Sequence, residues 1–279
     1  MACLIDHLTN MPLTQVARDA VSSLHTLMCS EVWASNRNVA HSVDLPGLQG
    51  WIYSAPLELG HDGGDIHYLS ACDYGVLSRV VLADVSGHGR AVGAVAEQLL
   101  RLVRKHMNRL EQPVLLAELS ASLQTLAATN VPTYATALVL GFDSSSGSLV
   151  FTDAGHPPPL WYSAADAQWR HLPGADFGGG PRLVGLPIGL GLGGTYEDVA
   201  VRLGEHDLVI CYTDGLSDTT DGRGVELGVD GLLELARELP TDSPMAAGAT
   251  LLGLVDAFRH GARATDDETL VVLRRSAGC

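Results

Sequence analysis

The chain has 279 residues, of which 46% are hydrophobic and 18% charged, so it can bury a sizeable core and is too apolar for a disordered protein. Seventeen Lys and Arg against 32 Asp and Glu give a formal net charge of −15, which disfavours binding to nucleic acids and to anionic membrane surfaces. We therefore expect a globular protein with neither nucleic acid nor membrane among its partners.

The first half of the chain predicts one helix, three strands and then two helices, in that order: 16–28, 51–53, 66–70, 76–83, 91–110 and 114–128. The opening helix is amphipathic, and we assign residues 1–45 to an N-terminal helical extension. Glycines after Asp84 end the third strand. The two later helices each carry an apolar face, which predicts that they pack against a sheet.

The second half predicts five strands, two helices and a last strand: 134–142, 148–152, 160–162, 198–203, 207–212, 229–238, 245–259 and 269–273. Residues 173–195 have the glycine-rich composition of a loop. Strand runs separated by helix pairs favour an α+β fold in which helices cover the outer faces of antiparallel sheets. We expect residues 46–279 to form one domain.

The cysteines indicate where the chain functions. They are odd in number, widely spaced and never arranged as Cys-x-x-Cys: Cys3, Cys29, Cys72, Cys211 and Cys279. Such a set predicts neither a disulfide framework nor a zinc ribbon. The first residues lack the apolar core of a signal peptide, and no stretch is apolar enough to span a membrane. We expect a cytoplasmic protein.

Four acidic residues lie beside predicted strand ends: Asp65, Asp84, Asp214 and Asp266. Each alone is most simply a turn residue or a helix cap. Together they would gather at one sheet edge, where two carboxylates ~5 Å apart repel by on the order of 3 kcal/mol at a dielectric of about 20. Bound cations would offset that repulsion, and oxygen-only donors select Mg²⁺ or Mn²⁺ over Zn²⁺. Two such ions can activate water for displacement at phosphorus.

Seven motifs resemble, in order, the bacterial branch of the metal-dependent protein phosphatases (type 2C superfamily), typified by the sporulation stage II protein E and the stress-sigma-factor regulatory phosphatases. They are Gly63-Gly-Asp65, Ala83-Asp-Val-Ser-Gly-His-Gly89, Tyr134-Ala-Thr-Ala137, Asp153-Ala-Gly-His-Pro-Pro158, Leu186-Pro-Ile-Gly189, Tyr212-Thr-Asp-Gly-Leu216 and Asp266-Asp-Glu-Thr-Leu270. The resemblance extends over residues 45–274. It implies a four-layer α/β/β/α sandwich of two antiparallel sheets flanked by helices, with a metal site at one edge.

By position, the resemblance implies that Asp84 bridges two Mn²⁺ or Mg²⁺ ions and that the Val85 carbonyl assists one of them. Asp65, Asp214 and Asp266 would complete the metal shells, directly or through water. Asp84, Asp65 and Asp214 are thus the candidate catalytic residues. The nucleophile would be a hydroxide bridging the ions, and the substrate a phosphoserine or phosphothreonine on a small anti-anti-sigma-type regulator.

The chain departs from the branch at several positions. Gly-Gly-Asp is usually followed by two aromatic residues and another Asp, whereas Ile66-His67-Tyr68 stands here, so one acidic position is missing. Asp153 and Asp218 stand where Asn and Glu are usual. Ser86 occupies the position of a histidine in eukaryotic relatives, and we assign no general-acid role to His88, which lies two residues further on.

Two other patterns have simpler interpretations. Residues 189–194 match the Gly-x-Gly-x-x-Gly dinucleotide fingerprint, but neither a strand before them nor a helix after them is predicted, so a flexible loop beside the active edge is preferred. His156 lies in a proline-rich corner, where a packed role is favoured over one lining a substrate cleft. A nicotinamide oxidoreductase would depend on the glycine loop alone.

The leading hypothesis is therefore a metal-dependent protein serine/threonine phosphatase, and the alternative is a catalytically inactive, partner-binding regulator on the same fold. No sensor domain is recognised, so control would come from a homodimer or a separate regulatory partner. The helices predicted at 91–110 and 114–128 directly follow the turn after Asp84. Their apolar residues Val95, Leu99 and Leu102 are read first as core and otherwise as a partner surface that switches activity.

Overall fold

The computed structural model describes residues 25–27, 32–57, 62–72, 75–87, 89–106, 108–127, 133–173 and 185–277. Its strands form two stacked sheets. The seven-stranded sheet has the order β1-β3-β4-β13-β12-β9-β10 and the six-stranded sheet the order β11-β8-β7-β6-β5-β2. Every described pair of neighbouring strands is antiparallel except β1 and β3.

The bounds of the seven-stranded sheet are β1 His25–Thr26, β3 Val39–Leu45, β4 Leu48–Ala55, β9 Leu160–Ser163, β10 Gln168–His171, β12 Leu208–Tyr212 and β13 Glu268–Arg275. Those of the six-stranded sheet are β2 Val32–Ser35, β5 Asp65–Cys72, β6 Leu77–Val85, β7 Ala135–Asp143, β8 Ser148–Ala154 and β11 Asp198–Arg202. The helices in the described residues are α3 Arg90–Lys105, α4 Gln112–Ala127, α5 Asp214–Ser217, α6 Gly228–Ala236 and α7 Pro244–Phe258.

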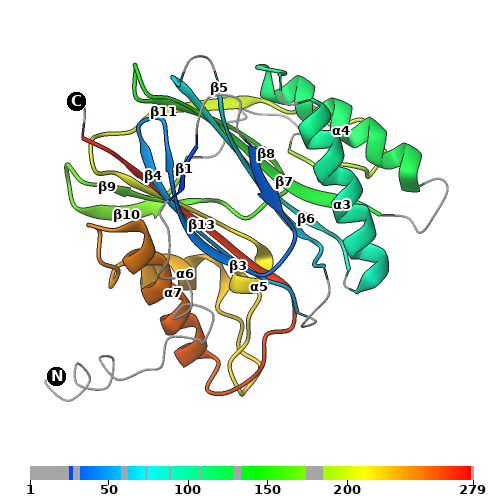
Figure 1. Cartoon of the computed structure of the whole chain (residues 1–279). Helices are drawn as coiled ribbons and strands as arrows, with labels where there is room; N and C mark the ends of the chain where they lie inside the picture. The colour runs from blue at the N-terminus through cyan, green and yellow to red at the C-terminus, as the bar shows by residue number, and fades with distance from the viewer. Residues whose placement is uncertain are drawn as a thin grey trace, which may run out of the picture.

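Helices cover both outer faces of the sandwich. Figure 1 shows α3 and α4 on one side of the stacked sheets and α6 and α7 on the other. The apolar residues form three separate layers: one between α3/α4 and the six-stranded sheet, one between the sheets, and one between the seven-stranded sheet and α6/α7. The predicted α/β/β/α sandwich is therefore confirmed.

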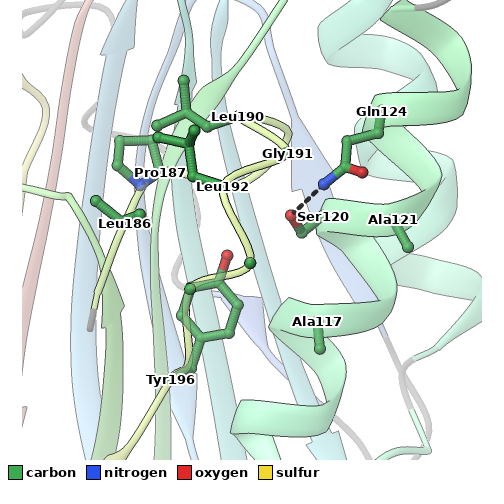
Figure 2. Close-up of a pocket in the computed structure, with 12 residues that line it drawn as sticks. Ala117, Ser120, Ala121, Gln124, Leu186, Pro187, Leu190, Gly191, Leu192 and Tyr196 are labelled. Carbon is green, nitrogen blue, oxygen red and sulfur yellow. Dashed lines mark hydrogen bonds between the residues drawn. The ribbon is translucent and has the colours of Figure 1, made fainter. Parts of the chain in front are cut away.

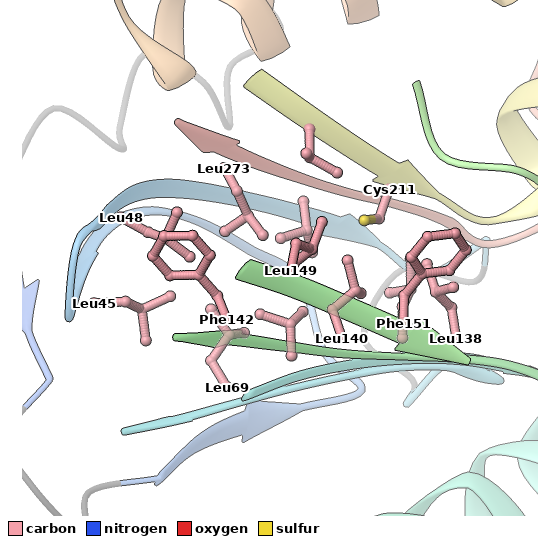
Figure 3. Close-up of a cluster of buried hydrophobic side chains, with 14 of the residues drawn as sticks. Leu45, Leu48, Leu69, Leu138, Leu140, Phe142, Leu149, Phe151, Cys211 and Leu273 are labelled. Atoms are coloured by element: carbon pink, nitrogen blue, oxygen red, sulfur yellow. The ribbon is translucent and has the colours of Figure 1, made fainter. Parts of the chain in front are cut away.

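The layer between the sheets holds the two sheets face to face. Alternating side chains of β7 and β13 point into it, including Leu140, Phe142 and Leu273, and Figure 3 shows them interleaved with side chains of the facing strands. Cys211 is a free thiol in the same layer. The alternation follows from the period of two along a strand.

The structure corrects several predicted boundaries. The predicted helix at 16–28 lies outside the described residues except for His25, Thr26 and Leu27, none of which is helical, and β1 to β3 occupy residues assigned to the helical extension. Helix α3 ends at Lys105 rather than 110, and α4 starts at Gln112 because proline is tolerated in a first turn. None of the helices in the described residues is long and apolar enough to cross a membrane.

Candidate metal centre

The six-stranded sheet contributes two of the predicted acidic residues. Asp65 begins β5 and Asp84 is the penultimate residue of β6, and the two are direct partners across the antiparallel pair. Asp65 is 2% exposed and Asp84 is half-buried. Val85 ends β6, and its carbonyl faces Gly64, where a Cβ would approach that oxygen to 3.0 Å. The glycine before Asp65 therefore lets the two strands approach closely.

The seven-stranded sheet contributes the other two. Asp214 follows β12 as the first residue of α5, and Asp266 lies two residues before β13. Because β12 and β13 are antiparallel neighbours, the end of one meets the start of the other. The Thr213 hydroxyl donates a 2.7 Å hydrogen bond to Asp65 Oδ2 and accepts one of 2.9 Å from the Thr269 amide. This contact ties the acidic end of one sheet to that of the other.

The carboxylates repel one another. Burial, followed by the charges of Asp214 and Asp266, raises the pKa of Asp84 to about 8. Burial, followed by Asp218 and Asp266, raises the pKa of Asp214 to about 6. Burial and the charge of Asp84 raise the pKa of Asp65 well above its usual range, although the Thr213 hydrogen bond opposes that rise. The four predicted residues thus share one electrostatic environment.

These residues suit a hard divalent cation in charge and in donor type. All are carboxylates, and a cation among them would relieve both the repulsion and the cost of burying negative charge. Among the residues that the structure describes, no three Asp, Glu, His or Cys side chains converge into a closed metal-binding cluster. The four carboxylates therefore lie on separate segments along one edge and do not form a preformed cage.

Asp267 has a role that the sequence analysis missed. It is buried, its Oδ1 accepts a 2.6 Å hydrogen bond from the Leu57 amide, and its Oδ2 accepts one of 2.5 Å from the Gly64 amide. Asp267 lies beside Asp266 in the last of the seven motifs, and its two hydrogen bonds hold the backbone that leads into β5. The sequence signal for this contact is the pair of glycines before Asp65. A Cβ on Gly63 would approach Asp267 Oδ2 to 2.9 Å, so a residue without a side chain suits that position.

Gly215 and Asp218 complete the turn after β12. A Cβ on Gly215 would collide with the backbone carbonyl of Asp267, which explains the glycine of the Thr-Asp-Gly motif. Asp218 is exposed and accepts a 2.9 Å hydrogen bond from Ser217. Its charge contributes to the raised pKa of both Asp84 and Asp214, so it is a further acidic residue at this edge.

Of the two histidines considered from the sequence, the structure describes only His156. His156 is buried, its Nδ1 is 2.8 Å from the Thr136 hydroxyl, and its amide donates to Asp153 Oδ1 at 2.7 Å. Burial lowers the pKa of His156 to about 3, so the ring is neutral, as the packed interpretation predicts. Tyr68, at the position where the branch has an acid, is fully buried beneath the helices. His88 lies outside the described residues.

The glycine-rich segment lies against α4 rather than in a nucleotide site. Ile188 and Ala135 exchange backbone hydrogen bonds of 2.8 and 2.9 Å, and the Gly189 amide donates to the Ser120 hydroxyl of α4. A cavity of about 170 Å³ lies between this segment and α4. Figure 2 shows residues that line it, among them Gln124, which donates a hydrogen bond to the Ser120 hydroxyl. Residues 189–194 follow no strand and open no helix, which excludes the dinucleotide fingerprint.

Comparison with known proteins identifies relatives with this fold. Residues 77–276 match the family described as Stage II sporulation protein E (SpoIIE). Phosphoserine phosphatase RsbP of Bacillus subtilis (strain 168) is 25% identical over 225 residues, which are 79% of this chain and 50% of that protein. The chain thus spans about half the length of this curated relative.

Solved structures have the same architecture. The RsbU and RsbW domains of a Mycobacterium tuberculosis protein superpose with a TM-score of 0.69 at 24% identity, covering 88% of this chain and 64% of that one. The PP2C phosphatase domain of SpoIIE from Bacillus subtilis, solved with a fragment of its regulatory domain, superposes with a TM-score of 0.68 at 20% identity. The match covers 83% of this chain and 64% of that one. The SiaA-PP2C domain of Pseudomonas aeruginosa superposes with a TM-score of 0.67 at 17% identity, covering 81% of this chain and 85% of that one. At these identities the likeness establishes the fold.

Proposed function

Because the chain belongs to the SpoIIE family, we propose that it is a protein serine/threonine phosphatase that depends on Mn²⁺ or Mg²⁺. One observation carries the proposal: carboxylates from both sheets lie at one edge, where burial and then the neighbouring negative charges raise their pKa values. A scaffold that served only to bind a partner would gain nothing from that repulsion. The location we expect for the enzyme is the cytoplasm.

We assign the metal-binding roles to five residues: Asp65, Asp84, Val85, Asp214 and Asp266. Asp84 would bridge two ions, the Val85 carbonyl would assist, and the remaining carboxylates would complete the shells. Such ions, when bound, lower the pKa of a water molecule and stabilise negative charge at phosphorus. Thr213 keeps Asp65 oriented by its hydrogen bond, so Asp65 loses little side-chain freedom on binding.

The substrate we propose is a phosphorylated anti-anti-sigma-type regulator carrying phosphoserine or phosphothreonine. The relative RsbP is itself named a phosphoserine phosphatase, and the solved RsbU and RsbW domains occur together in one protein. No covalent phosphoenzyme is expected, because the attacking group in this proposal is water rather than a side chain.

A catalytically inactive regulator on the same fold is the second candidate. The observation that favours it is Tyr68, which is buried where the branch has another acidic residue. The two candidates differ in turnover, because an inactive regulator would keep its fold and its partner without hydrolysing phosphate esters.

The deciding experiment is hydrolysis of p-nitrophenyl phosphate with Mn²⁺, with and without chelator. Asp84→Asn should abolish turnover while the protein stays folded, because it removes the charge proposed to bridge the ions. Asp166→Asn is the matched control. Asp166 is an exposed carboxylate in the turn between β9 and β10, and it pairs with Arg170 of β10. Mn²⁺-dependent turnover by folded Asp84→Asn would remove Asp84 from the site, and no turnover by the wild type would favour the inactive regulator.

A further inference from the structure

A buried arginine lies behind the acidic edge. Arg259 directly follows α7 and is 5% exposed. Its Nε donates a 2.6 Å hydrogen bond to the Thr219 hydroxyl, its Nη1 lies 3.1 Å from Asp256 Oδ1, and its Nη2 donates to Glu268 Oε1. Thr219 and Glu268 are also buried. One guanidinium group thus contacts the segment after α5, the last turn of α7 and the start of β13, and two of its three partners are buried.

Two of these partners belong to the acidic turns. Thr219 directly follows Asp218 in the segment that begins with Asp214, and its carbonyl accepts a 2.9 Å hydrogen bond from the Leu227 amide. Glu268 directly follows Asp266 and Asp267 and begins β13. Arg259 therefore joins the turn after β12 to the turn before β13.

Stability alone is a weak explanation for this contact. A buried ion pair costs desolvation energy that its attraction often only offsets, and apolar replacements of similar volume are frequently as stable. A positive charge at a helix C-terminus is favourable, but that effect requires no contact with either acidic turn. The planar guanidinium does, however, fix the directions of several hydrogen bonds at once, which a lysine cannot do.

We propose that Arg259 is a positioning residue that sets the spacing between the Asp214 turn and the Asp266 turn, and thereby the affinity of this chain for Mn²⁺. The inference rests on the proposed function, because it takes both turns to bind metal. Groups that hold metal ligands in place typically contribute about 10- to 100-fold in metal affinity. Arg259 would act through the turns, without touching metal or substrate.

Three variants test the proposal by calorimetric titration with Mn²⁺, alongside melting in chelator. Thr219→Val removes one acceptor and keeps the ion pair with Glu268. Arg259→Met combined with Glu268→Met replaces the pair by apolar side chains and leaves no unpaired buried charge. Arg259→Lys keeps the charge but not the planar fork. Arg237→Met is the matched control, because Arg237 likewise follows a helix and pairs three residues back, with Glu234, but is exposed.

We expect Thr219→Val and the double variant to bind Mn²⁺ at least about 10-fold more weakly. Metal-free melting should stay close to that of the wild type in the double variant and fall in Thr219→Val, which leaves the Arg259 Nε donor without its acceptor. Arg259→Lys should also bind Mn²⁺ more weakly although the positive charge remains, and it should melt somewhat lower because a lysine cannot make all three hydrogen bonds. Arg237→Met should change neither Mn²⁺ binding nor melting. Wild-type Mn²⁺ affinity in folded Thr219→Val would overturn the inference and leave the proposed function standing, even if the double variant failed to fold. A wild-type protein that binds no Mn²⁺ would overturn both.

Discussion

Asp65 and Asp84 lie directly opposite each other on the neighbouring strands β5 and β6. Like charges in this relationship destabilise a sheet, and burial adds to the cost. With a pKa of about 8, Asp84 is largely protonated at neutral pH when no cation is bound. Protons and metal ions therefore compete for the same carboxylates.

The metal-free protein should lose stability as the pH rises from about 4 to about 8. The folded-state pKa values of Asp84 and Asp214 exceed the unfolded value of about 3.9, so the folded state binds more protons in this window. The stabilisation is complete below the unfolded pKa and is lost as the pH passes the folded values. Urea unfolding in chelator at several pH values measures this. Asp84→Asn should flatten the profile, and an equally steep profile in that variant would contradict the assignment.

Mn²⁺ should stabilise the folded protein. An ion that binds only the folded state contributes about 2.7 kcal/mol at 100-fold excess over its Kd. Melting in increasing Mn²⁺ or Mg²⁺ measures the shift, and the rise should be larger at pH 8 than at pH 6, because protonated carboxyl groups bind metal poorly. Zn²⁺ should not support turnover. If the melting temperature does not change over a wide range of Mn²⁺ and Mg²⁺ concentrations, the result would favour the inactive regulator.

Asp266 and Asp267 should respond differently to the same substitution. Asp267→Asn puts an amide NH₂ against one of two backbone donors, Leu57 or Gly64, and should lower the free energy of unfolding by about 1–3 kcal/mol. Asp266→Asn should weaken Mn²⁺ binding with little loss of metal-free stability. Unfolding in chelator and Mn²⁺ titration of both variants separate the two roles. If Asp266→Asn instead lowered the stability and Asp267→Asn weakened Mn²⁺ binding, Asp267 would be the metal ligand and Asp266 the structural residue.

Gly215→Ala should be strongly destabilising. The new Cβ would collide with the Asp267 carbonyl, which is backbone and cannot move without shifting the start of β13. Strain of this kind commonly costs about 1–3 kcal/mol or more. Gly222→Ala is the control, because a Cβ there meets nothing within 4 Å. Equal melting temperatures for the two variants would show that the turn adapts.

Leu99 distinguishes a structural role of α3 from a switching role. It is fully buried between α3 and the six-stranded sheet, so Leu99→Ala should cost about 2–5 kcal/mol of unfolding free energy. The kcat and Mn²⁺ dependence of the folded fraction should stay unchanged. Leu110→Ala, at a 64% exposed position, is the control. A large change in kcat at unchanged stability would instead support a switch in the helices.

The element order predicted an α+β fold with helices outside antiparallel sheets, and the family resemblance implied the four-layer sandwich that the structure has. Asp84 lies at the end of one strongly apolar strand and Asp214 comes two residues after another, and in antiparallel neighbours the end of one strand lies beside the start of the next. Strand β10 was missed because its residues are only partly buried and carry no alternating apolar pattern. The strand at 39–45 was missed although Val39, Val43 and Leu45 recur with strand periodicity, because the segment was assigned to the helical extension.

The supporting contacts could not be predicted from the sequence. Asp266 and Asp267 are adjacent, and only the Leu57 and Gly64 amides, which lie 210 and 203 positions away, show that Asp267 has a bracing role. Arg259 likewise lies outside the seven motifs, and nothing in the sequence places it near Thr219. Long-range polar contacts of this kind leave no local periodic pattern.

The hydrogen bonds from Thr213 to Asp65 and from Gly64 to Asp267 also make this end of the sandwich unlike the rest. The core layer between the sheets is apolar, which neither protons nor ions can alter. The hydrogen bonds from Ser78 to the Pro46 carbonyl and from Arg275 to the Leu203 carbonyl also join the sheets, but neither involves a carboxylate. At the acidic end the two sheets are fastened through carboxylates, so the same chemical event that charges or neutralises them also changes how firmly the sheets are held together. A cation bound there would act as a cross-link between two sheets, and its release would loosen the sandwich at that end.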